Sequence, residues 1–193
     1  MVERIPRMAA WRHIDAREAF EVAFTTPSAT GLRIDGQTAA VEEGEAFAVR
    51  YAIHIDAAWR TRSAHLWGRS AGGTYERLLE ADGEGGWRID GAPAPSLDGL
   101  LDVDLEASAM TNAFPVRRMR LAVGAAADAP AAYVRALDLA VERLDQRYGR
   151  LPDGPDGGER YAYGAPRFAT FCDLVYAPDG FVVDYPGLAE RAL

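Results

Sequence analysis

Two aspartates, Asp102 and Asp104, have the spacing in this chain that comes nearest to a catalytic pair. In an extended strand, residues two apart point to the same side, so both carboxylates would face one way. Glycoside hydrolysis needs two carboxyl groups about 5–10 Å apart, and this spacing fits that requirement loosely. A network of aspartates and arginines that ties strands together explains the same residues, and we favour it over a hydrolase.

Arg117 follows this pair in a stretch that alternates like a strand. In strand phase it shares its face with Met119 and Leu121, so a guanidinium occupies a position where a core side chain is expected. An unpaired buried charge is costly, and Arg117 therefore needs a partner or an aqueous cavity. We predict that Asp102 and Asp104 are its partners.

The chain offers few other residues for catalysis or metal binding. Its three histidines fall on separate expected strands and lack ligand spacing. The single cysteine, Cys172, lies in an apolar run, which favours a buried small hydrophobe and excludes an internal disulfide and a cysteine-based zinc site. No GxSxG, GxGxxG or Walker pattern is present. We therefore expect no metal site, no cofactor and no assigned catalytic residue.

Composition and charge limit the classes of partner. A chain of 193 residues with 49% hydrophobic residues can form one full core, and we expect a single domain over residues 1–193. The net charge of −8 argues against nucleic acid and anionic membrane surfaces as general partners.

The beginning of the sequence carries charges throughout and has no apolar run of about 7–15 residues, so it does not resemble a secretory signal. No stretch approaches the roughly 20 apolar residues of a membrane span. The expectation is a cytoplasmic protein without an integral membrane segment.

Hydrophobic alternation and turn signals predict an all-β chain. The clearest strand is 47–55, where alternate residues from Phe47 to Ile55 are apolar. Within 31–41, the pair Asp35-Gly36 suggests a hairpin turn. We predict strands at 11–13, 19–26, 31–41, 47–55, 59–67, 74–81, 87–90, 102–105, 116–121, 131–151, 159–163, 167–176 and 181–185.

Three segments are less regular. Residues 131–151 fit both helical spacing and strand alternation, and we favour strand because the surrounding pattern is all-β. Single helical turns are expected at 97–101 and 187–193, and 125–130 reads as a linker of small residues. Many short strands and little helix predict a curled antiparallel sheet, a β-roll or an incomplete barrel, which can enclose a ligand cavity.

Six short motifs, in order along the chain, carry a resemblance to a known family. They are DAAWRTR from Asp56, GW at Gly86 with DG at Asp90, DVDL from Asp102, TNAFPVRR from Thr111, QRY from Gln146 and DYPGL from Asp184. In this order the chain resembles the bacterial "putative glycolipid-binding" family over about residues 10–191. The resemblance implies a β-rich curled sheet or β-roll and the binding of a glycolipid, and it supplies no catalytic residues.

We therefore predict a non-enzymatic binding protein that holds an amphipathic ligand, such as a glycolipid, on the concave face of its sheet. The expected ligand-binding residues are Trp59, Arg60, Arg62, Asp102, Asp104, Asn112 and Arg117. A hydrolase acting on a sugar or ester through the aspartate pair would instead need a carboxylate of raised pKa in a cleft. A structural or oligomeric protein would instead close Arg117 and the aspartates into a dry network. The sequence leaves the ligand and the oligomeric state open.

Overall fold

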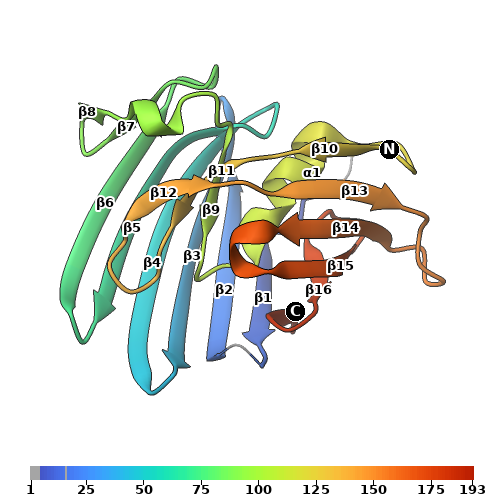
Figure 1. The fold of residues 1–193 in the computed structure, drawn as a ribbon, viewed down its shortest axis with the longest axis horizontal. Helices are drawn as coiled ribbons and strands as arrows, with labels where there is room; N and C mark the ends of the chain where they lie inside the picture. Colours follow the sequence, from blue (N-terminus) through green and yellow to red (C-terminus); the bar gives the residue numbers. More distant parts are fainter. Residues whose placement is uncertain (1–4, 16) are drawn as a thin grey trace.

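The computed structural model describes residues 5–15 and 17–193, and most of this part of the chain is antiparallel β-sheet. Fourteen strands form one curled sheet that does not close into a barrel, as Figure 1 shows. This confirms the predicted fold class. In sheet order the strands are β10 (Ala126–Asp128), β13 (Arg147–Leu151), β14 (Glu159–Ala165), β15 (Thr170–Tyr176), β16 (Val182–Tyr185), β17 (Ala189–Arg191), β1 (Met8–His13), β2 (Glu18–Pro27), β3 (Gly31–Glu42), β4 (Glu45–Asp56), β5 (Thr61–Ser70), β6 (Gly73–Ala81), β7 (Trp87–Ile89) and β8 (Ala92–Pro93).

A smaller, three-stranded sheet packs against the long strands, in the order β12 (Val141–Leu144), β11 (Ala131–Val134) and β9 (Asp102–Leu105). β9 and β11 run parallel, and every residue of both is buried. Thr61 at the start of β5 joins the sheets, because its hydroxyl accepts a 3.0 Å hydrogen bond from the Val103 amide. Strands covered on both faces need apolar or fully paired side chains, so any charge on β9 requires a partner.

One α-helix is present among the described residues, α1 (Ala113–Met119), directly after the 3-10 turn η2 (Met110–Asn112). The strand predicted for 116–121 is therefore wrong. The five consecutive residues from Ala113 to Arg117 are all buried, on both phases of the apparent alternation, so the alternation did not mark a one-sided strand. Pro115 lies in the first turn, where a missing amide hydrogen costs nothing, and Arg120 ends the helix in a left-handed conformation.

The Asp35-Gly36 turn is also wrong, because β3 runs unbroken from Gly31 to Glu42. Gly36 has a packing role instead. A Cβ atom there would lie 2.2 Å from the Tyr51 ring, which passes over the glycine on the inner face of the sheet. The Tyr51 hydroxyl then donates a 2.6 Å hydrogen bond to the buried carboxylate of Glu21 on β2. Glycine is required here by the close approach of an aromatic ring.

Several element boundaries differ from the prediction. β5 begins at Thr61, since Trp59 has a positive φ of 64° in the preceding turn. The ambiguous 131–151 is extended as predicted, but it is divided into β11, β12 and β13. The 91–101 segment has a 3-10 turn, η1 (Pro95–Leu97), before the predicted position. The helical turn predicted for 187–193 is wrong, because β17 lies there and pairs with β1 and β16. The segment 125–130, predicted as a linker, contains the strand β10.

The buried apolar side chains form two clusters. The larger lies between the small sheet and the inner faces of β1 to β6, and it includes Ile34, Ile53, Val103 and Val134. The smaller is rich in tyrosine and packs β13 to β16 against α1. Leu188 contacts both clusters. The polar groups of the candidate site lie at the tyrosine-rich cluster, beside β9 and β11.

Candidate functional site

A cavity of about 220 Å³, which we call the tyrosine cleft, opens beside the tyrosine-rich cluster. Its polar lining comes from distant parts of the chain: the loop before β2, β9, η2, β11, β14 and β16. Tyrosine, carboxylate, amide and guanidinium side chains line one small volume, so the cleft combines several kinds of hydrogen-bonding group. The residues that carry this chemistry are Arg17, Asp104, Asn112, Tyr133, Tyr163 and Tyr185.

Asp104 is the buried carboxylate of the cleft, with only 8% of its surface exposed. The Thr111 hydroxyl donates a 2.8 Å hydrogen bond to its Oδ1. Burial raises the pKa of Asp104 to about 6, and the nearby charges of Asp102 and Glu106 add to the rise, whereas the Thr111 bond opposes it. Asp104 therefore changes its charge close to neutral pH and accepts hydrogen bonds more strongly above pH 6.

The tyrosines form a linked set of donors. Tyr148 donates a 2.9 Å hydrogen bond to the Asn112 side-chain oxygen, and Tyr163 donates a 2.9 Å hydrogen bond to Gln146 Oε1. The ring centroids of Tyr148 and Tyr163 are 5.0 Å apart, and those of Tyr163 and Tyr185 are 5.7 Å apart. Burial raises the pKa of Tyr163 and Tyr148, so both remain protonated donors. The side-chain orientation of Asn112 is fixed by this set.

The buried carboxylate of Glu21, outside the cleft, is hydrogen-bonded to the loop before η2, which carries cleft residues. Glu21 accepts hydrogen bonds from the Ser108 hydroxyl and, at 2.8 Å, from the Ala109 amide. Glu21 also accepts the hydrogen bond from the hydroxyl of Tyr51, whose ring lies against Gly36. Three donors on one carboxylate satisfy the buried charge. They fix the 108–109 backbone directly before η2, and η2 in turn places Asn112 in the cleft.

Asp102 lies outside the cleft lining although it is on the same strand as Asp104. Arg118 donates to both of its oxygens, with Nη2 at 2.5 Å and Nε at 3.1 Å. The prediction that Arg117 pairs with the aspartates is therefore wrong. Because the segment is helical, successive side chains point about 100° apart, and Arg118 is the one directed at β9. Arg117 instead donates to the Asp179 carbonyl, and its guanidinium lies 5.1 Å from the Trp59 ring.

The other predicted residues gather at the turn between β4 and β5. Arg60 donates a 2.9 Å hydrogen bond to Asp56, and Arg62 lies 3.9 Å from the same carboxylate. Trp59 is buried with its ring 6.4 Å from that of Phe114. These three residues are not among those that line the tyrosine cleft. The structure thus brings only Asp104 and Asn112 of the predicted set into the cavity.

Residues 8–191 match the family model described as "Putative glycolipid-binding". The chain belongs to this family. It is 32% identical to a DUF1089 family protein from Pseudomonas aeruginosa of known crystal structure, with a TM-score of 0.79 over 94% of this chain and 95% of that chain. A "beta-barrel-like protein" of the DUF1849 domain from Brucella abortus is 10% identical, with a TM-score of 0.54 over 99% and 96% of the two chains, and supports the fold alone. No curated protein matches the sequence.

Residues 5–15 and 17–193 of this family member contain no helix long and apolar enough to cross a membrane. Sequence reasoning missed most of the cleft. Arg17 donates a 3.1 Å hydrogen bond to the Glu106 carbonyl and lies 3.4 Å from the Glu42 carboxylate at the edge of the cleft. The sequence signal for the tyrosine lining was the presence of aromatic residues such as Tyr163 and Tyr185 on expected strands, which a glycan cleft would use and which core packing explains equally well.

Proposed function

We propose that this protein binds an amphipathic ligand without chemical conversion, and that the tyrosine cleft holds the ligand's uncharged, hydroxyl-rich head group. One observation carries the proposal: carboxylate, amide and tyrosine groups from five separate elements converge on one cavity of about 220 Å³. Small-molecule sites combine apolar walls with a few such convergent polar groups. The family description supports a glycolipid as the ligand.

The charge of the cleft supports an uncharged head group. Asp104, Glu106 and Glu42 line it, and Arg17 is the single cation among the residues that line it. Arg17 is already engaged by Glu42 and by the Glu106 carbonyl. A phosphate or carboxylate head group would meet carboxylates without a free cation, which costs several kcal/mol in order of magnitude. Sugar hydroxyls can instead donate to carboxylate and amide oxygens.

Of the predicted ligand-binding residues, Asp104 and Asn112 are proposed to contact the head group, because both line the cleft. Asp102 is proposed to support the site through its pairing with Arg118, which fixes α1 against β9. We assign no direct contact with the head group to the residues at the β4–β5 turn or to Arg117.

The test is a titration of short, soluble head-group analogues into isotope-labelled protein, followed by amide chemical shifts. Methyl glycosides of glucose, galactose and mannose are expected to move the amides of Leu105, Asn112 and Tyr133, whereas methyl glucuronide and glycerol phosphate are not. Asp104→Asn or Asn112→Ala is expected to weaken the neutral ligands about tenfold, since each removes one charged or buried hydrogen bond. Arg60→Ala, outside the cleft, is the control. Equal binding of the anionic analogues, or no effect of any glycoside at these amides, would overturn the proposal.

Glycoside hydrolysis is the second candidate, because the pKa of Asp104, raised to about 6, suits a general acid. The predicted partner, Asp102, is occupied by Arg118, so Glu106 or Glu42 would have to supply the second carboxyl group. Release of nitrophenol from 4-nitrophenyl hexosides, abolished in Asp104→Asn, would favour this activity. Binding without release would leave the non-enzymatic function in place.

A further inference from the structure

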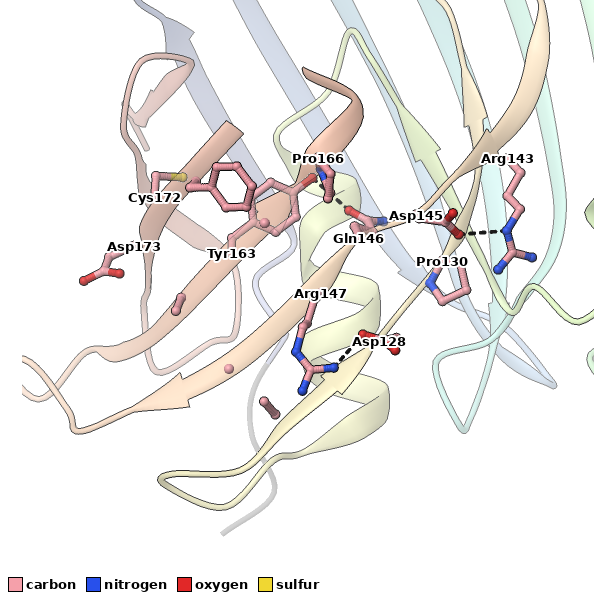
Figure 2. A pocket seen from close by; sticks show the side chains of 15 residues that line it. Asp128, Pro130, Arg143, Asp145, Gln146, Arg147, Tyr163, Pro166, Cys172 and Asp173 are labelled. Atoms are coloured by element: carbon pink, nitrogen blue, oxygen red, sulfur yellow. Dashed lines mark hydrogen bonds and ion pairs between the residues drawn. The ribbon is translucent and has the colours of Figure 1, made fainter. Parts of the chain in front are cut away.

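A larger hollow of about 780 Å³, which we call the outer groove, lies on the outer face of β10, β13, β14 and β15 (Figure 2). Strand register places small residues side by side in part of its floor, where Gly149 pairs with Ala162 and with Ala126. The neighbouring Gly164 is covered by the ring of its cross-strand partner Phe171. An apolar ligand can therefore lie against the sheet at Gly149 and beside the Phe171 ring. The charged residues that line the groove are paired, Arg147 with Asp128 at 2.6 Å, Arg143 with Asp145 at 2.8 Å and Asp173 with Arg160 at 2.7 Å.

The outer groove and the tyrosine cleft adjoin along one segment, residues 166–171. Pro166 and Phe171 line the groove, whereas Phe168 and Thr170 line the cleft. Tyr163 lines both hollows. In Figure 2 its side chain extends toward Gln146, near Pro166. A single molecule bound at this segment can therefore reach both hollows.

Two phenylalanine side chains of this segment are exposed, beside Arg167, whose guanidinium pairs with Glu142 at 2.7 Å. Phe171 is 71% exposed and Phe168 is 46% exposed. Covering this apolar surface would be stabilising, so its exposure marks a candidate binding surface. Phe168 lies 5.3 Å from Tyr133 between ring centroids, at the cleft. Cys172 lines the groove as well, and burial raises the pKa of its thiol to about 11, so it acts there as an apolar group. Apolar surface thus continues from the polar cleft into the groove.

We propose that the outer groove holds the alkyl chain of the ligand whose head group lies in the tyrosine cleft, the molecule crossing at residues 166–171. This inference rests on the proposed function, because it takes the head group's position from it. The continuity of the two hollows favours one amphipathic molecule over a protein partner. The charged residues of the groove lining are all paired, so they leave no unmatched charge for a protein surface to complement.

The test measures affinity for n-alkyl β-D-glucopyranosides of four to nine carbons, kept below their micelle concentrations. Each added methylene buried in the groove is expected to tighten binding about three- to fourfold. Gly149→Leu fills the groove, and its Cβ meets Ala126 and Ala162 at 3.6 and 3.8 Å, which are ordinary contact distances. Ala162→Leu fills it from the next strand. Both variants are expected to abolish the gain with chain length and to leave the affinity for methyl glucoside unchanged. Ala46→Leu, at an exposed strand position outside both hollows, is the matched control.

The outcomes separate this inference from the proposed function. If methyl glucoside binds but the gain with chain length survives Gly149→Leu, the chain lies elsewhere and the inference fails alone. If alkyl glucosides shift the amides of Gly149 and Gly164 but not that of Asn112, the groove binds the chain and the head-group proposal fails. If wild-type protein dimerises in sedimentation experiments and Gly149→Leu separates the dimer, a second copy covers the groove and the inference is overturned. The inference is confirmed if the gain in affinity with alkyl chain length is lost in both Gly149→Leu and Ala162→Leu and is kept in Ala46→Leu.

Discussion

Thr111 donates a 2.8 Å hydrogen bond to Asp104, and this bond joins the start of the helical segment to a buried strand. A carboxylate inside a protein costs free energy unless its oxygens are satisfied. The Leu105 amide also stabilises the ionised form, yet burial outweighs both bonds and the pKa of Asp104 is raised to about 6. The cavity thus holds a carboxylate whose ionised form is only partly stabilised by the protein, and under the proposed function ligand hydroxyls would supply further donors.

The first prediction concerns stability and pH. Because the pKa of Asp104 is higher in the folded protein than the usual value near 3.8, the folded state binds more protons than the unfolded state between about pH 4 and 6. The contribution of Asp104 to stability is therefore present below pH 4 and is lost as the pH rises through 6. Asp104→Asn is expected to be more stable than the wild type by about 3 kcal/mol at pH 8. Urea unfolding at pH 4, 6 and 8 measures this difference.

The same series contains its own control, since Asn can accept the Thr111 bond but does not titrate. The difference between the two proteins is expected to shrink toward zero at pH 4. A difference that stays constant from pH 4 to 8 would show that Asp104 is not responsible for it.

The second prediction concerns the glycine beneath Tyr51. Gly36→Ala places a Cβ atom 2.2 Å from the Tyr51 ring, and the ring is fully buried and hydrogen-bonded to Glu21. Overpacking of this kind costs about 1–3 kcal/mol. Gly149→Ala is the matched control, because its new Cβ meets neighbours at 3.6 Å or more, and it is expected to be neutral or stabilising. Equal unfolding free energies for the two variants would contradict the packing role of Gly36.

The third prediction tests which arginine pairs with Asp102. Arg118→Ala leaves a carboxylate that is 1% exposed without its partner, and such losses cost about 3–5 kcal/mol. The exposed pair Arg147–Asp128 is the comparison, with side chains 58% and 74% exposed, and Arg147→Ala is expected to cost less than about 1 kcal/mol. Adding Asp102→Asn to Arg118→Ala is expected to recover part of the loss. No recovery in this double variant would contradict the pairing.

The fourth prediction concerns domain organisation. Two apolar clusters could unfold separately, but β1 and β17 join their strands in one hydrogen-bonded sheet and Leu188 packs against both clusters. We therefore expect residues 1–193 to unfold as one domain. Tryptophan fluorescence reports unfolding of the larger cluster, and near-UV circular dichroism of tyrosine reports unfolding of the smaller one. The urea transitions measured by the two signals are expected to coincide. Two separate midpoints would divide the chain into two domains.

The sequence predicted most of the sheet because strand periodicity is a local signal. Phe47 to Ile55 alternate as expected, and the same alternation is buried in β4. The prediction failed at 116–121, where Arg117, Met119 and Leu121 alternate like a strand for a few residues, although α1 buries every residue from Ala113 to Arg117. At Gly36 the local turn signal was overridden by a long-range contact, the Tyr51 ring, which no short window of sequence contains.

The cleft was less predictable for the same reason. Asp104 and Asn112 carry polar groups in buried surroundings and could be selected from the sequence. Arg17, Tyr133 and Tyr185 reach the cavity only through the curl of the sheet and the placement of β11 beside β9. Their positions depend on strand order rather than on spacing, so the partners of Asp104 become visible only in the folded chain.

The most direct test of the central claim is native mass spectrometry of the protein after gentle purification from its own host, with organic extraction of any bound molecule. A stoichiometric amphipathic molecule with an uncharged sugar head group is expected, and it should be absent from the Asn112→Ala and Gly149→Leu proteins prepared in parallel. A ligand-free mass for the wild-type protein, together with no binding of alkyl glycosides or detergents added afterwards, would contradict the account.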